Sequence, residues 1–403
     1  MKHFFTLSAF LIACICNAQT WNQQTSVNTI DLYSVHFVDV NNGWVCGLTG
    51  TIEHTNDGGQ TWVQQTSPVS DNLRGIFFAD VNNGWCVGDN GKVLHTSNGG
   101  NTWATQTSGT TNQLRSVCFT STTQGWAVGQ SGTIITTTNG GTSWTPQTSG
   151  VTQTIFSVHF NNATSGWAAG NSAPSTQGFI LVTSNGGTTW TPQTPPTNQN
   201  LFGIDFVNAT NGWACGAGGT LFTTTNGGTT WTSQTSPAVH TWRSTSFPST
   251  MIGWAVGDSG SVVNTTNGGA TWTVQPTFMI SWLRGVYFVD NFAGWAVGDN
   301  GTILRYSSPG AVHENEKPLN AIDAYPNPST GTFSFHVNLA TEQTLHVSMT
   351  DVMGRVVYEQ EIFASPGDHC LEAGIPYSCT DGIYMLKVEG KDFNGSGRVI
   401  IRR

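Results

Sequence analysis

The sequence contains few charged residues, because Lys, Arg, Asp and Glu together make up only 9% of its 403 residues. Surface helices present a charged and polar face to water, and this chain has few charged residues to form such faces. The composition therefore favours an all-β fold. The 14 basic residues are outnumbered by 23 acidic residues, which gives a net charge of -9. A nucleic-acid partner would require a basic face, so this charge balance argues against one.

Long apolar runs are lacking after residue 18. Before it, Lys2 and His3 precede an apolar run over residues 4–16, and the small residue Ala18 follows. This is the layout of a secretory signal peptide (residues 1–18), too short to span a bilayer. We therefore expect cleavage after Ala18, export from the cytoplasm, no transmembrane segment and a monomer. Residues 11–14 also fit a lipoprotein cleavage box, which would leave Cys14 lipidated.

Cysteine is scarce, with six residues remaining after the signal peptide. Cys370 and Cys379 are the only two outside the repeats described below, and export implies an oxidising compartment, so we predict a disulfide between them. No C-x-x-C or other zinc spacing occurs, and no cofactor motif is present, so neither a metal nor a cofactor is expected. The other four occupy repeat positions where Ala or Val also occurs, which predicts small buried apolar residues: Cys46, Cys86, Cys118 and Cys215.

One short motif recurs along three quarters of the chain. It reads TTNGGTTW at residues 224–231, and near copies begin at Thr55, Thr96, Thr137, Thr183 and Thr265. Asn-Gly and Asp-Gly dipeptides favour tight hairpin turns, and the flanking Thr and Trp residues favour strands. The motif resembles the Asp-box, or bacterial neuraminidase, repeat. Only Asp57 keeps the acid of that repeat, and Asn replaces it in the other copies.

A Gly-Trp pair measures the repeat length. It recurs at spacings of 41, 41, 41, 46, 41 and 41 residues, at Trp44, Trp85, Trp126, Trp167, Trp213, Trp254 and Trp295. Each unit contains four short β runs, which is typical of one blade of a β-propeller. The last unit lacks its fourth strand, whereas residues 20–25 form a strand without a unit. We therefore predict a seven-bladed propeller over residues 19–308, with the N-terminal strand completing the seventh blade.

These units resemble the seven-bladed propeller family of photosystem II assembly and stability factors, which share L-R-x-V-x-F, G-W-x-V-G and G-G-x-T-W elements. The resemblance covers Gln19 to about Ser308 and implies the fold. It does not imply one function, since Asp-box propellers also include sialidases, xyloglucanases and sortilin-type receptors.

A composition change marks the end of the propeller. Residues 309–320 are rich in Pro, Gly and charge, which is typical of a linker. Residues 321–403 alternate apolar and polar positions, and this predicts a small Ig-like β-sandwich of roughly seven strands. The motifs YPNPSTG at 325–331, MTDVMGRVV at 349–357 and GIYMLKV at 382–388 make this segment similar to the type A sorting domain of the type IX secretion system. The resemblance implies that the type IX machinery is a partner and that the protein reaches the cell surface or the medium.

One repeat position, at the start of the first strand of each unit, reads Tyr33, Arg74, Arg115, Phe156, Phe202, Arg243 and Arg284. Propeller geometry would bring these residues together around the channel mouth. Trp242 and Trp282 lie beside Arg243 and Arg284, and the only length change in the array, around residues 172–177, falls on the same face. We predict that the Tyr, the four Arg and the two Trp residues bind a ligand, either a peptide carboxylate or an anionic glycan. The photosystem assembly family also carries an arginine patch on its propeller.

A competing interpretation is that the arginines only stabilise the blades. Asp89, Asp258 and Asp299 follow the Gly-Trp strand in three of the four units that carry Arg. An Arg-Asp pair within a blade is therefore expected. Only Arg115, opposite Gln130, lacks such a partner.

Acidic residues suitable for catalysis are few. A glycosidase requires two carboxylates on one face, but most acids of the propeller recur with the repeat and thus mark scaffolding. The non-repeating candidates are Asp31, Asp71 and Asp205, and Glu53 is the only Glu of the propeller. We predict no catalytic residues and a non-enzymatic propeller that binds a protein, peptide or glycan. The alternatives are an Asp-box glycoside hydrolase acting on polysaccharide and a purely structural surface protein.

Overall fold

The structure is a computed structural model that describes residues 20–171, 177–307, 320–322, 324–351, 355–376 and 379–402. The chain divides into two units, Met1–Ala311 and Val312–Arg403. The expected signal peptide, the alternative lipidation site at Cys14, residues 309–319 of the expected linker and residues 172–176 of the repeat insertion lie outside the described residues. In the part of the chain that is described, no helix has the length and apolarity needed to cross a membrane.

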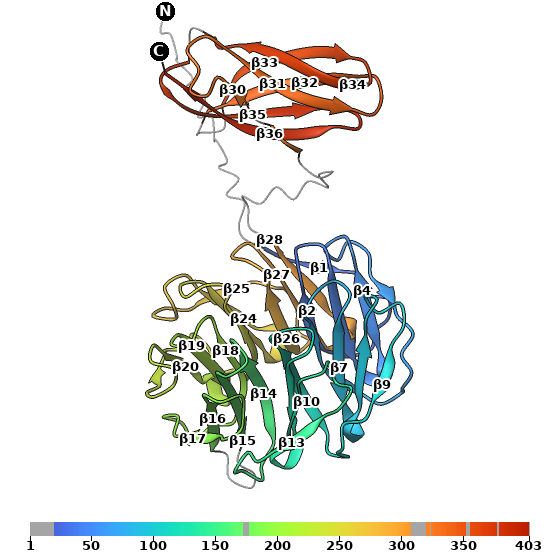
Figure 1. Ribbon diagram of the computed structural model, residues 1–403. Coiled ribbons are helices and arrows are strands. Elements are labelled where there is room, and N and C mark those ends of the chain that lie inside the picture. Colours follow the sequence, from blue (N-terminus) through green and yellow to red (C-terminus); the bar gives the residue numbers. More distant parts are fainter. Residues whose placement is uncertain are drawn as a thin grey trace, which may run out of the picture. The chain divides into compact units, whose positions relative to one another are not determined.

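The first unit consists of seven four-stranded antiparallel sheets, which are the blades of a β-propeller (Figure 1). The first strands of the blades are β2 (Leu32–Phe37), β6 (Leu73–Phe78), β10 (Leu114–Phe119), β14 (Ile155–Phe160), β18 (Leu201–Phe206), β22 (Trp242–Ser246) and β26 (Leu283–Phe288). The second strands are β3 (Gly43–Gly47), β7 (Gly84–Gly88), β11 (Gly125–Gly129), β15 (Gly166–Asn171), β19 (Gly212–Gly216), β23 (Gly253–Gly257) and β27 (Ala293–Gly298). First strands of adjacent blades lie against one another, so they form the innermost layer of the propeller.

The outer half of each blade is a hairpin. Its third strands are β4 (Ile52–Thr55), β8 (Val93–Thr96), β12 (Ile134–Thr137), β16 (Gly178–Thr183), β20 (Leu221–Thr224), β24 (Val262–Thr265) and β28 (Ile303–Ser307). The fourth strands are β5 (Val63–Gln64), β9 (Ala104–Gln106), β13 (Thr145–Gln147), β17 (Thr191–Gln193), β21 (Thr232–Ser233), β25 (Thr273–Gln275) and β1 (Thr20–Gln24). Short 3-10 turns join the second and third strands of blades 1, 2, 3, 5, 6 and 7: η1 (Leu48–Gly50), η2 (Asp89–Gly91), η3 (Gln130–Gly132), η4 (Ala217–Gly219), η5 (Asp258–Gly260) and η6 (Asp299–Gly301).

The N-terminal strand closes the ring, as predicted. Strand β1 pairs with β28 from Thr20 opposite Ser307 to Gln24 opposite Ile303, so the seventh sheet combines both ends of the propeller sequence (Figure 1). This pairing gives β28 a partner strand and removes an exposed sheet edge.

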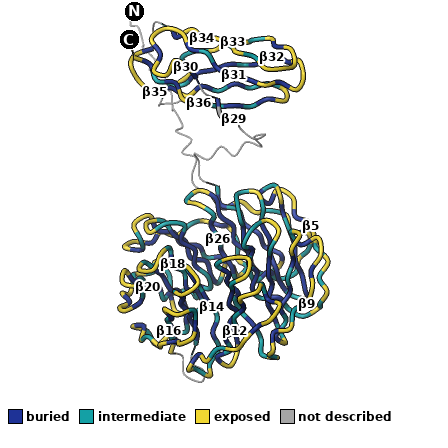
Figure 2. Tube along the Cα trace, viewed as in Figure 1, coloured by how far each residue is buried: buried dark blue, intermediate teal, exposed yellow. Residues whose placement is uncertain are grey.

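The Gly-Trp pair explains how the blades pack. The Trp44 ring stacks on Phe78 of the next blade at 3.6 Å between centroids, and a Cβ on Gly43 would lie 2.2 Å from the Phe37 ring. Glycine therefore leaves the space that the phenylalanine fills. The same stacking joins the other neighbouring blades through Trp85–Phe119, Trp126–Phe160, Trp167–Phe206, Trp213–Phe247, Trp254–Phe288 and Trp295–Phe37. Buried residues accordingly follow the strands, whereas exposed residues cluster in the turns (Figure 2).

Each Asp-box turn is closed by its own side chains. In the first copy, the Thr55 hydroxyl accepts a hydrogen bond from the Gly59 amide at 2.8 Å, and Asp57 accepts one from the Thr61 amide at 2.9 Å. In the second copy, the Asn98 carbonyl oxygen accepts from the Thr102 amide at 3.0 Å. Because an Asn oxygen replaces the carboxylate oxygen as the acceptor, the turn survives the loss of the acid.

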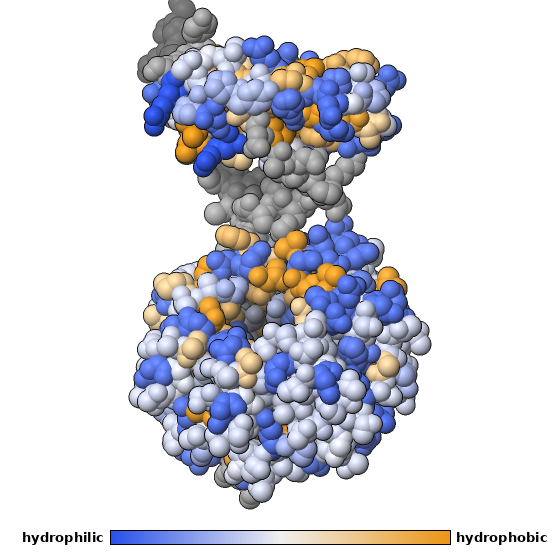
Figure 3. Space-filling view, viewed as in Figure 1, coloured by the Kyte–Doolittle hydropathy of each residue, from blue (hydrophilic) through white to orange (hydrophobic). Residues whose placement is uncertain are grey.

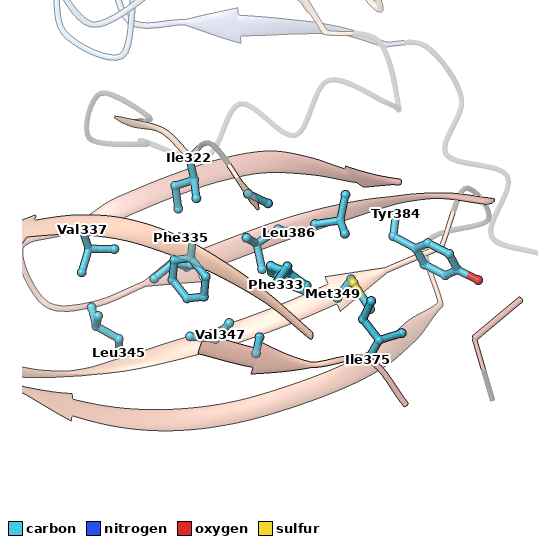
Figure 4. Packing of buried hydrophobic residues seen from close by; sticks show 14 of the residues in the cluster. Ile322, Phe333, Phe335, Val337, Leu345, Val347, Met349, Ile375, Tyr384 and Leu386 are labelled. Carbon is cyan, nitrogen blue, oxygen red and sulfur yellow. The ribbon is translucent and has the colours of Figure 1, made fainter. Parts of the chain in front are cut away.

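The second unit is a sandwich of a five-stranded and a three-stranded sheet, eight strands where about seven were expected. Its strands are β29 (Asn320–Ala321), β30 (Ala324–Tyr325), β31 (Thr332–Leu339), β32 (Gln343–Thr350), β33 (Val356–Ala364), β34 (Gly367–Gly374), β35 (Gly382–Glu389) and β36 (Asn394–Ile401). Apolar side chains of both sheets, among them Phe335, Val347 and Leu386, meet in one core (Figure 4).

The predicted disulfide between Cys370 and Cys379 is wrong for this structure. Cys370 is an exposed free thiol on β34, whose sulfur lies 3.0 Å from the Tyr325 hydroxyl. Cys379 is instead buried in the sandwich core. The two side chains therefore occupy different environments, and nearness in sequence did not bring the sulfur atoms together. The four cysteines of the propeller are buried free thiols, as predicted.

Candidate functional site: a basic pocket at the channel mouth

A cavity of about 230 Å³ opens where the innermost strands of the propeller begin. Its rim contains the second residue of every first strand, and we call these seven residues the mouth ring: Tyr33, Arg74, Arg115, Phe156, Phe202, Arg243 and Arg284. In every blade the strand register shifts at this residue, for example between Leu32 and Ser34. A β-bulge turns the side chain at that position away from its usual direction. The repeat alignment grouped these residues, and the structure brings all seven to one cavity.

The cavity floor is built from small residues. The residue after each mouth-ring position is Ser34, Gly75, Ser116, Ser157, Gly203, Ser244 or Gly285. The Ser34 hydroxyl accepts a hydrogen bond from the Ile76 amide of the next blade at 3.3 Å. At Gly75, an added Cβ would lie 3.1 Å from the Arg115 carbonyl oxygen. The blades therefore approach closely below the rim, and the large charged and aromatic side chains of the cavity lining belong to the rim.

Guanidinium groups and aromatic rings alternate around most of the rim. In order, the contacting pairs are Arg74–Tyr33, Tyr33–Arg284, Arg284–Trp282, Trp282–Arg243, Arg243–Phe202, Phe202–Phe156 and Phe156–Arg115, at 4.4 to 6.0 Å. Such contacts stabilise a cation at the face of a ring. The alternation has two breaks, because Phe202 and Phe156 are neighbouring aromatic rings, and because Arg115 and Arg74 are adjacent with no mouth-ring aromatic residue between them.

Three of the four rim arginines pair with an aspartate of their own blade, as predicted. Arg74 Nε lies 2.5 Å from Asp89 Oδ1. The same ion pair joins Arg243 to Asp258 and Arg284 to Asp299. All of these side chains are about 20% exposed. Solvent therefore screens each pair, which contributes only about 0–1 kcal/mol and leaves guanidinium N–H groups for other partners.

Arg115 differs from the other three arginines. It forms no ion pair with any described residue, and its Nε is buried without a hydrogen-bond partner among them. Asp89, the aspartate whose charge acts on Arg115, already accepts hydrogen bonds from Arg74, Asn72 and Gln113. Burial, followed by the positive charge of Arg74, lowers the pKa of Arg115 to about 10. Arg115 is thus a charged, partly buried donor at neutral pH with an unused N–H group.

The sequence did not reveal why Asp89 forms no ion pair with Arg115. Asn72 and Gln113 both lie two positions before a rim arginine, in adjacent blades, and both donate to Asp89. Their shared repeat position, which carries an amide only in some blades, was the available signal.

The two tryptophans predicted to bind the ligand occupy different environments in the structure. Trp282 is 42% exposed, and its ring lies 4.4 Å from the Arg243 guanidinium carbon, so it forms part of the rim. The prediction for Trp242 is wrong, because this residue is fully buried and its indole N–H donates to Ser236. Trp242 occupies the repeat position of Leu32 and Leu283, which point into the blade packing rather than toward the channel.

A second ring lies three residues further along the same strands. It consists of His36, Phe77, Cys118, His159, Asp205, Ser246 and Tyr287. Neighbouring members meet in pairs: the His36 ring lies 4.4 Å from both Phe77 and Tyr287, and His159 Nδ1 lies 3.1 Å from Asp205 Oδ1. Burial alone would lower the pKa of His159, but the hydrogen bond and charge of Asp205 outweigh burial and raise it.

The acids named as possible catalytic residues each accept hydrogen bonds from other residues of the propeller. Asp31 accepts a hydrogen bond from the Asn300 amide at 2.9 Å, and Asp71 accepts one from the Asn90 side chain at 2.7 Å. Asp205 belongs to the second ring, where it pairs with His159. Within the described ranges, no group of three or more His, Cys, Asp or Glu side chains could hold a metal ion.

Fold and pocket together define an Asp-box propeller with a basic channel mouth. A family model described as "Photosynthesis system II assembly factor YCF48" matches residues 14–108, 103–195 and 189–274, more than half of the chain. The chain therefore belongs to this family. Residues 323–402 match a model described as "Secretion system C-terminal sorting domain", which implies secretion to the cell surface or beyond it.

Solved structures share the propeller. YCF48 bound to D1 peptide is 22% identical with a TM-score of 0.63, and the match covers 72% of this chain and 96% of that chain. YCF48 from Cyanidioschyzon merolae is 22% identical with a TM-score of 0.62, covering 73% and 100%. A catalytically inactive virginiamycin B lyase from Staphylococcus aureus with quinupristin is 13% identical with a TM-score of 0.56, covering 72% and 100%. These similarities establish the fold and extend to an enzyme. No curated protein matches the sequence.

Proposed function

We propose that the propeller is a secreted, non-enzymatic binding module whose mouth pocket holds a carboxylate group of a peptide or an anionic glycan. The observation that carries this proposal is Arg115, a charged guanidinium with a buried Nε that no described residue satisfies. An unsatisfied buried donor costs about 1–3 kcal/mol, and a carboxylate is the partner that matches a guanidinium best. The structure of YCF48 with D1 peptide supports a peptide as one ligand class.

The size of the cavity limits what enters it. Its volume of about 230 Å³ is below the roughly 300–1,000 Å³ of pockets that enclose a whole small molecule. The pocket therefore suits the end of a larger ligand, such as one carboxylate with its nearest atoms. The remainder of the ligand would lie over the rim.

The glycoside hydrolase alternative finds less support. Hydrolysis of a glycosidic bond uses two carboxyl groups that flank it, and none of the described residues that line the cavity is Asp or Glu. Asp89, Asp258 and Asp299 lie behind the rim arginines as their ion-pair partners. These observations favour binding over catalysis.

The proposed route to the cell surface follows the domain order. The signal peptide (1–18) would direct the chain across the inner membrane and then be removed. Residues 321–403 would deliver it to the type IX secretion machinery, and the propeller (19–308) would be the functional cargo, joined by the linker (309–320). The propeller is proposed to act as a monomer.

The test compares the parent chain with Arg115→Ala on arrays of acidic peptides and acidic glycans. Lys92→Ala is the matched control, because it removes one positive charge from a residue that contacts Asp71 but does not line the cavity. Affinity should fall at least tenfold in Arg115→Ala and stay within about twofold in Lys92→Ala.

Other results would change the conclusion. Equal affinity of the parent and Arg115→Ala would exclude Arg115 as the anchor. Cleavage of an arrayed glycan would support the hydrolase, and binding of nothing on either array would favour a purely structural surface protein.

A further inference from the structure

The connections that lead into blades 6 and 7 expose large apolar side chains. Val239 lies between β21 and β22, whereas Phe278, Ile280 and Trp282 lie between β25 and β26. The exposed fractions are 86% for Val239, 95% for Phe278, 89% for Ile280 and 42% for Trp282. We call these four residues the apolar shelf. In the view of Figure 3 most of the propeller surface is polar, and the largest group of hydrophobic side chains lies near β1, β27 and β28.

The other blades show that the fold does not require an apolar residue at these positions. In blades 2, 3 and 4, the repeat position of Phe278 is occupied by Pro68, Gly109 and Gly150. The repeat position of Ile280 is occupied by Ser70, Thr111 and Thr152. The repeat position of Trp282 is occupied by Asn72, Gln113 and Thr154. A Cβ added to Gly109 or Gly150 would meet no atom within 4 Å. A side chain at the Phe278 position therefore projects into solvent and adds nothing to blade packing.

Phe278 also has an unusual backbone conformation. Its φ is +56°, in the left-handed region that side chains other than glycine rarely adopt. Thr277 helps to fix this turn, since its hydroxyl donates to the Gly260 carbonyl at 2.7 Å and accepts from the Met279 amide at 3.3 Å. A large apolar residue that is both strained and unburied does not serve folding, and such residues cluster at binding sites.

The apolar shelf is continuous with the pocket. The Trp282 ring contacts the guanidinium groups of Arg243 and Arg284, at 4.4 and 5.5 Å, and both arginines line the cavity. Arg115 belongs to blade 3, which is three blades away from both blade 6 and blade 7 around the ring. A ligand that meets Arg115 at one side of the mouth must therefore cross the mouth to reach the apolar shelf.

Building on the proposed function, we propose that the apolar shelf is the specificity subsite of this pocket and that the ligand is a peptide. Its carboxylate pairs with Arg115, and apolar side chains a few residues away pack on Phe278 and Ile280. A glycan fits less well, because sugar hydroxyls require hydrogen-bond partners and the apolar shelf presents aliphatic and phenyl surface. The Trp282 ring, the best platform for a sugar, already lies against Arg243.

The variants that test this inference come from the other repeats. Phe278→Gly and Ile280→Thr each install a residue found at the same position in blades 3 and 4. Val274→Thr is the matched control, because Val274 is a 56% exposed apolar residue on the outer strand β25. The probes are synthetic hexapeptides with a free carboxyl end, preceded by either Leu and Phe or Ser and Gln, and an oligouronic acid of similar length. Affinities are measured by calorimetry with the full chain.

The apolar peptides should bind about tenfold more weakly to Phe278→Gly and to Ile280→Thr than to the parent, since each substitution removes contact with one apolar side chain. Binding of the polar peptides should be weak and insensitive to these substitutions, and Val274→Thr should match the parent. The unfolding midpoint of Phe278→Gly should equal or exceed that of the parent, because glycine accepts the left-handed turn.

Equal affinity of the parent and both variants for the apolar peptides would overturn the inference. If Arg115→Ala still lost binding in that case, the proposed function would stand without it. Preferential binding of the oligouronic acid would overturn the peptide assignment and keep the anionic pocket. Unchanged peptide affinity in Arg115→Ala would remove the proposed function and this inference together. A lower unfolding midpoint of Phe278→Gly would show that Phe278 stabilises the fold, and that result would also contradict the proposal.

Discussion

The mouth ring and the second ring are built from the same seven strands, three residues apart. They differ in whether their charged side chains have partners within the protein. In the second ring, Asp205 is paired with His159 and also accepts the Phe247 amide at 2.7 Å. Ser246 accepts the Phe288 amide at 3.1 Å, and this use of a side chain as acceptor recurs between blades. In the mouth ring, by contrast, Arg115 keeps an unsatisfied buried N–H group.

The difference has a physical origin in the sheet edges. The innermost strand of each blade has an edge whose amides lack a partner strand, and buried amides require acceptors. His36, Asp205 and Ser246 of the second ring supply such acceptors to the next blade, so the chemistry of these residues is restricted. Mouth-ring residues sit on a bulge at the start of the strand, where no neighbouring amide depends on them. The mouth can therefore vary its charge and retain a group for a ligand.

The largest expected effect comes from breaking the second ring. Asp205→Ala should lower the free energy of unfolding by about 3 kcal/mol, because it leaves the Phe247 amide without an acceptor and His159 without its counter-charge. Urea unfolding followed by tryptophan fluorescence measures this loss. Asp205→Asn keeps an acceptor oxygen and should lose less. A loss below about 1 kcal/mol in Asp205→Ala would mean that the two rings do not differ as described.

His36 tests the same ring in acid. Burial lowers the pKa of His36 to about 3, below the ordinary value of about 6.5. The unfolded chain then binds the proton more readily than the folded protein, so stability is lost as the pH falls below about 6.5, by up to about 1.4 kcal/mol per pH unit. His36→Phe, which installs the residue type of Phe77, should remove this term. Between pH 6.5 and pH 5, the parent should lose about 2 kcal/mol more than the variant, and parallel losses would contradict the assignment.

Gln130→Asp should give blade 3, which carries Arg115, the Arg–Asp pair that the other three arginine-bearing blades contain. The new carboxylate would occupy the repeat position of Asp89, Asp258 and Asp299 and pair with Arg115. Affinity for acidic peptides should then fall about tenfold, as the ligand would compete with an internal partner. Stability should change by less than about 1 kcal/mol, because the corresponding pairs of the other blades are about 20% exposed and screened by solvent, so such pairs contribute little. Gln130→Asn is the control, and unchanged binding by Gln130→Asp would show that Arg115 does not need to be unpaired.

Repetition is the reason that so much of this molecule could be predicted. Seven Gly-Trp pairs fixed the blade number, and the unpaired strand at Trp21 indicated how the ring closes. Aligning the blades also predicted the three Arg-Asp pairs and singled out Arg115. The prediction failed where a residue departs from its repeat: Trp242 replaces a buried leucine, so its position in the repeat, rather than its aromatic character, determined its environment.

The remaining features depend on geometry that spacing does not encode. The left-handed turn at Phe278 exposes its side chain, and the local sequence does not predict the positive φ angle of this residue. The contact between His159 and Asp205 joins two blades, so it follows from how blades pack and not from either repeat alone. Cys370 and Cys379 are close in sequence, but Cys370 lies on β34 with its thiol exposed, whereas Cys379 lies in the connection after that strand and is buried in the core.

The smallest expected effect distinguishes the two histidines of the second ring. Burial opposes charge on His159, but Asp205 and then Asn161 outweigh it and raise the pKa. The folded protein thus holds this proton more tightly than the unfolded chain does. The resulting stability is fully present below the unfolded pKa of about 6.5 and is lost as the pH rises through the folded pKa, the reverse of His36. His159→Gln removes the titration, so the stability difference between parent and variant, measured by urea unfolding, should shrink from pH 6 to pH 9. A difference that grows over this range would mean that His159 is neutral in the folded protein, and the second ring would then contain no charge pair at all.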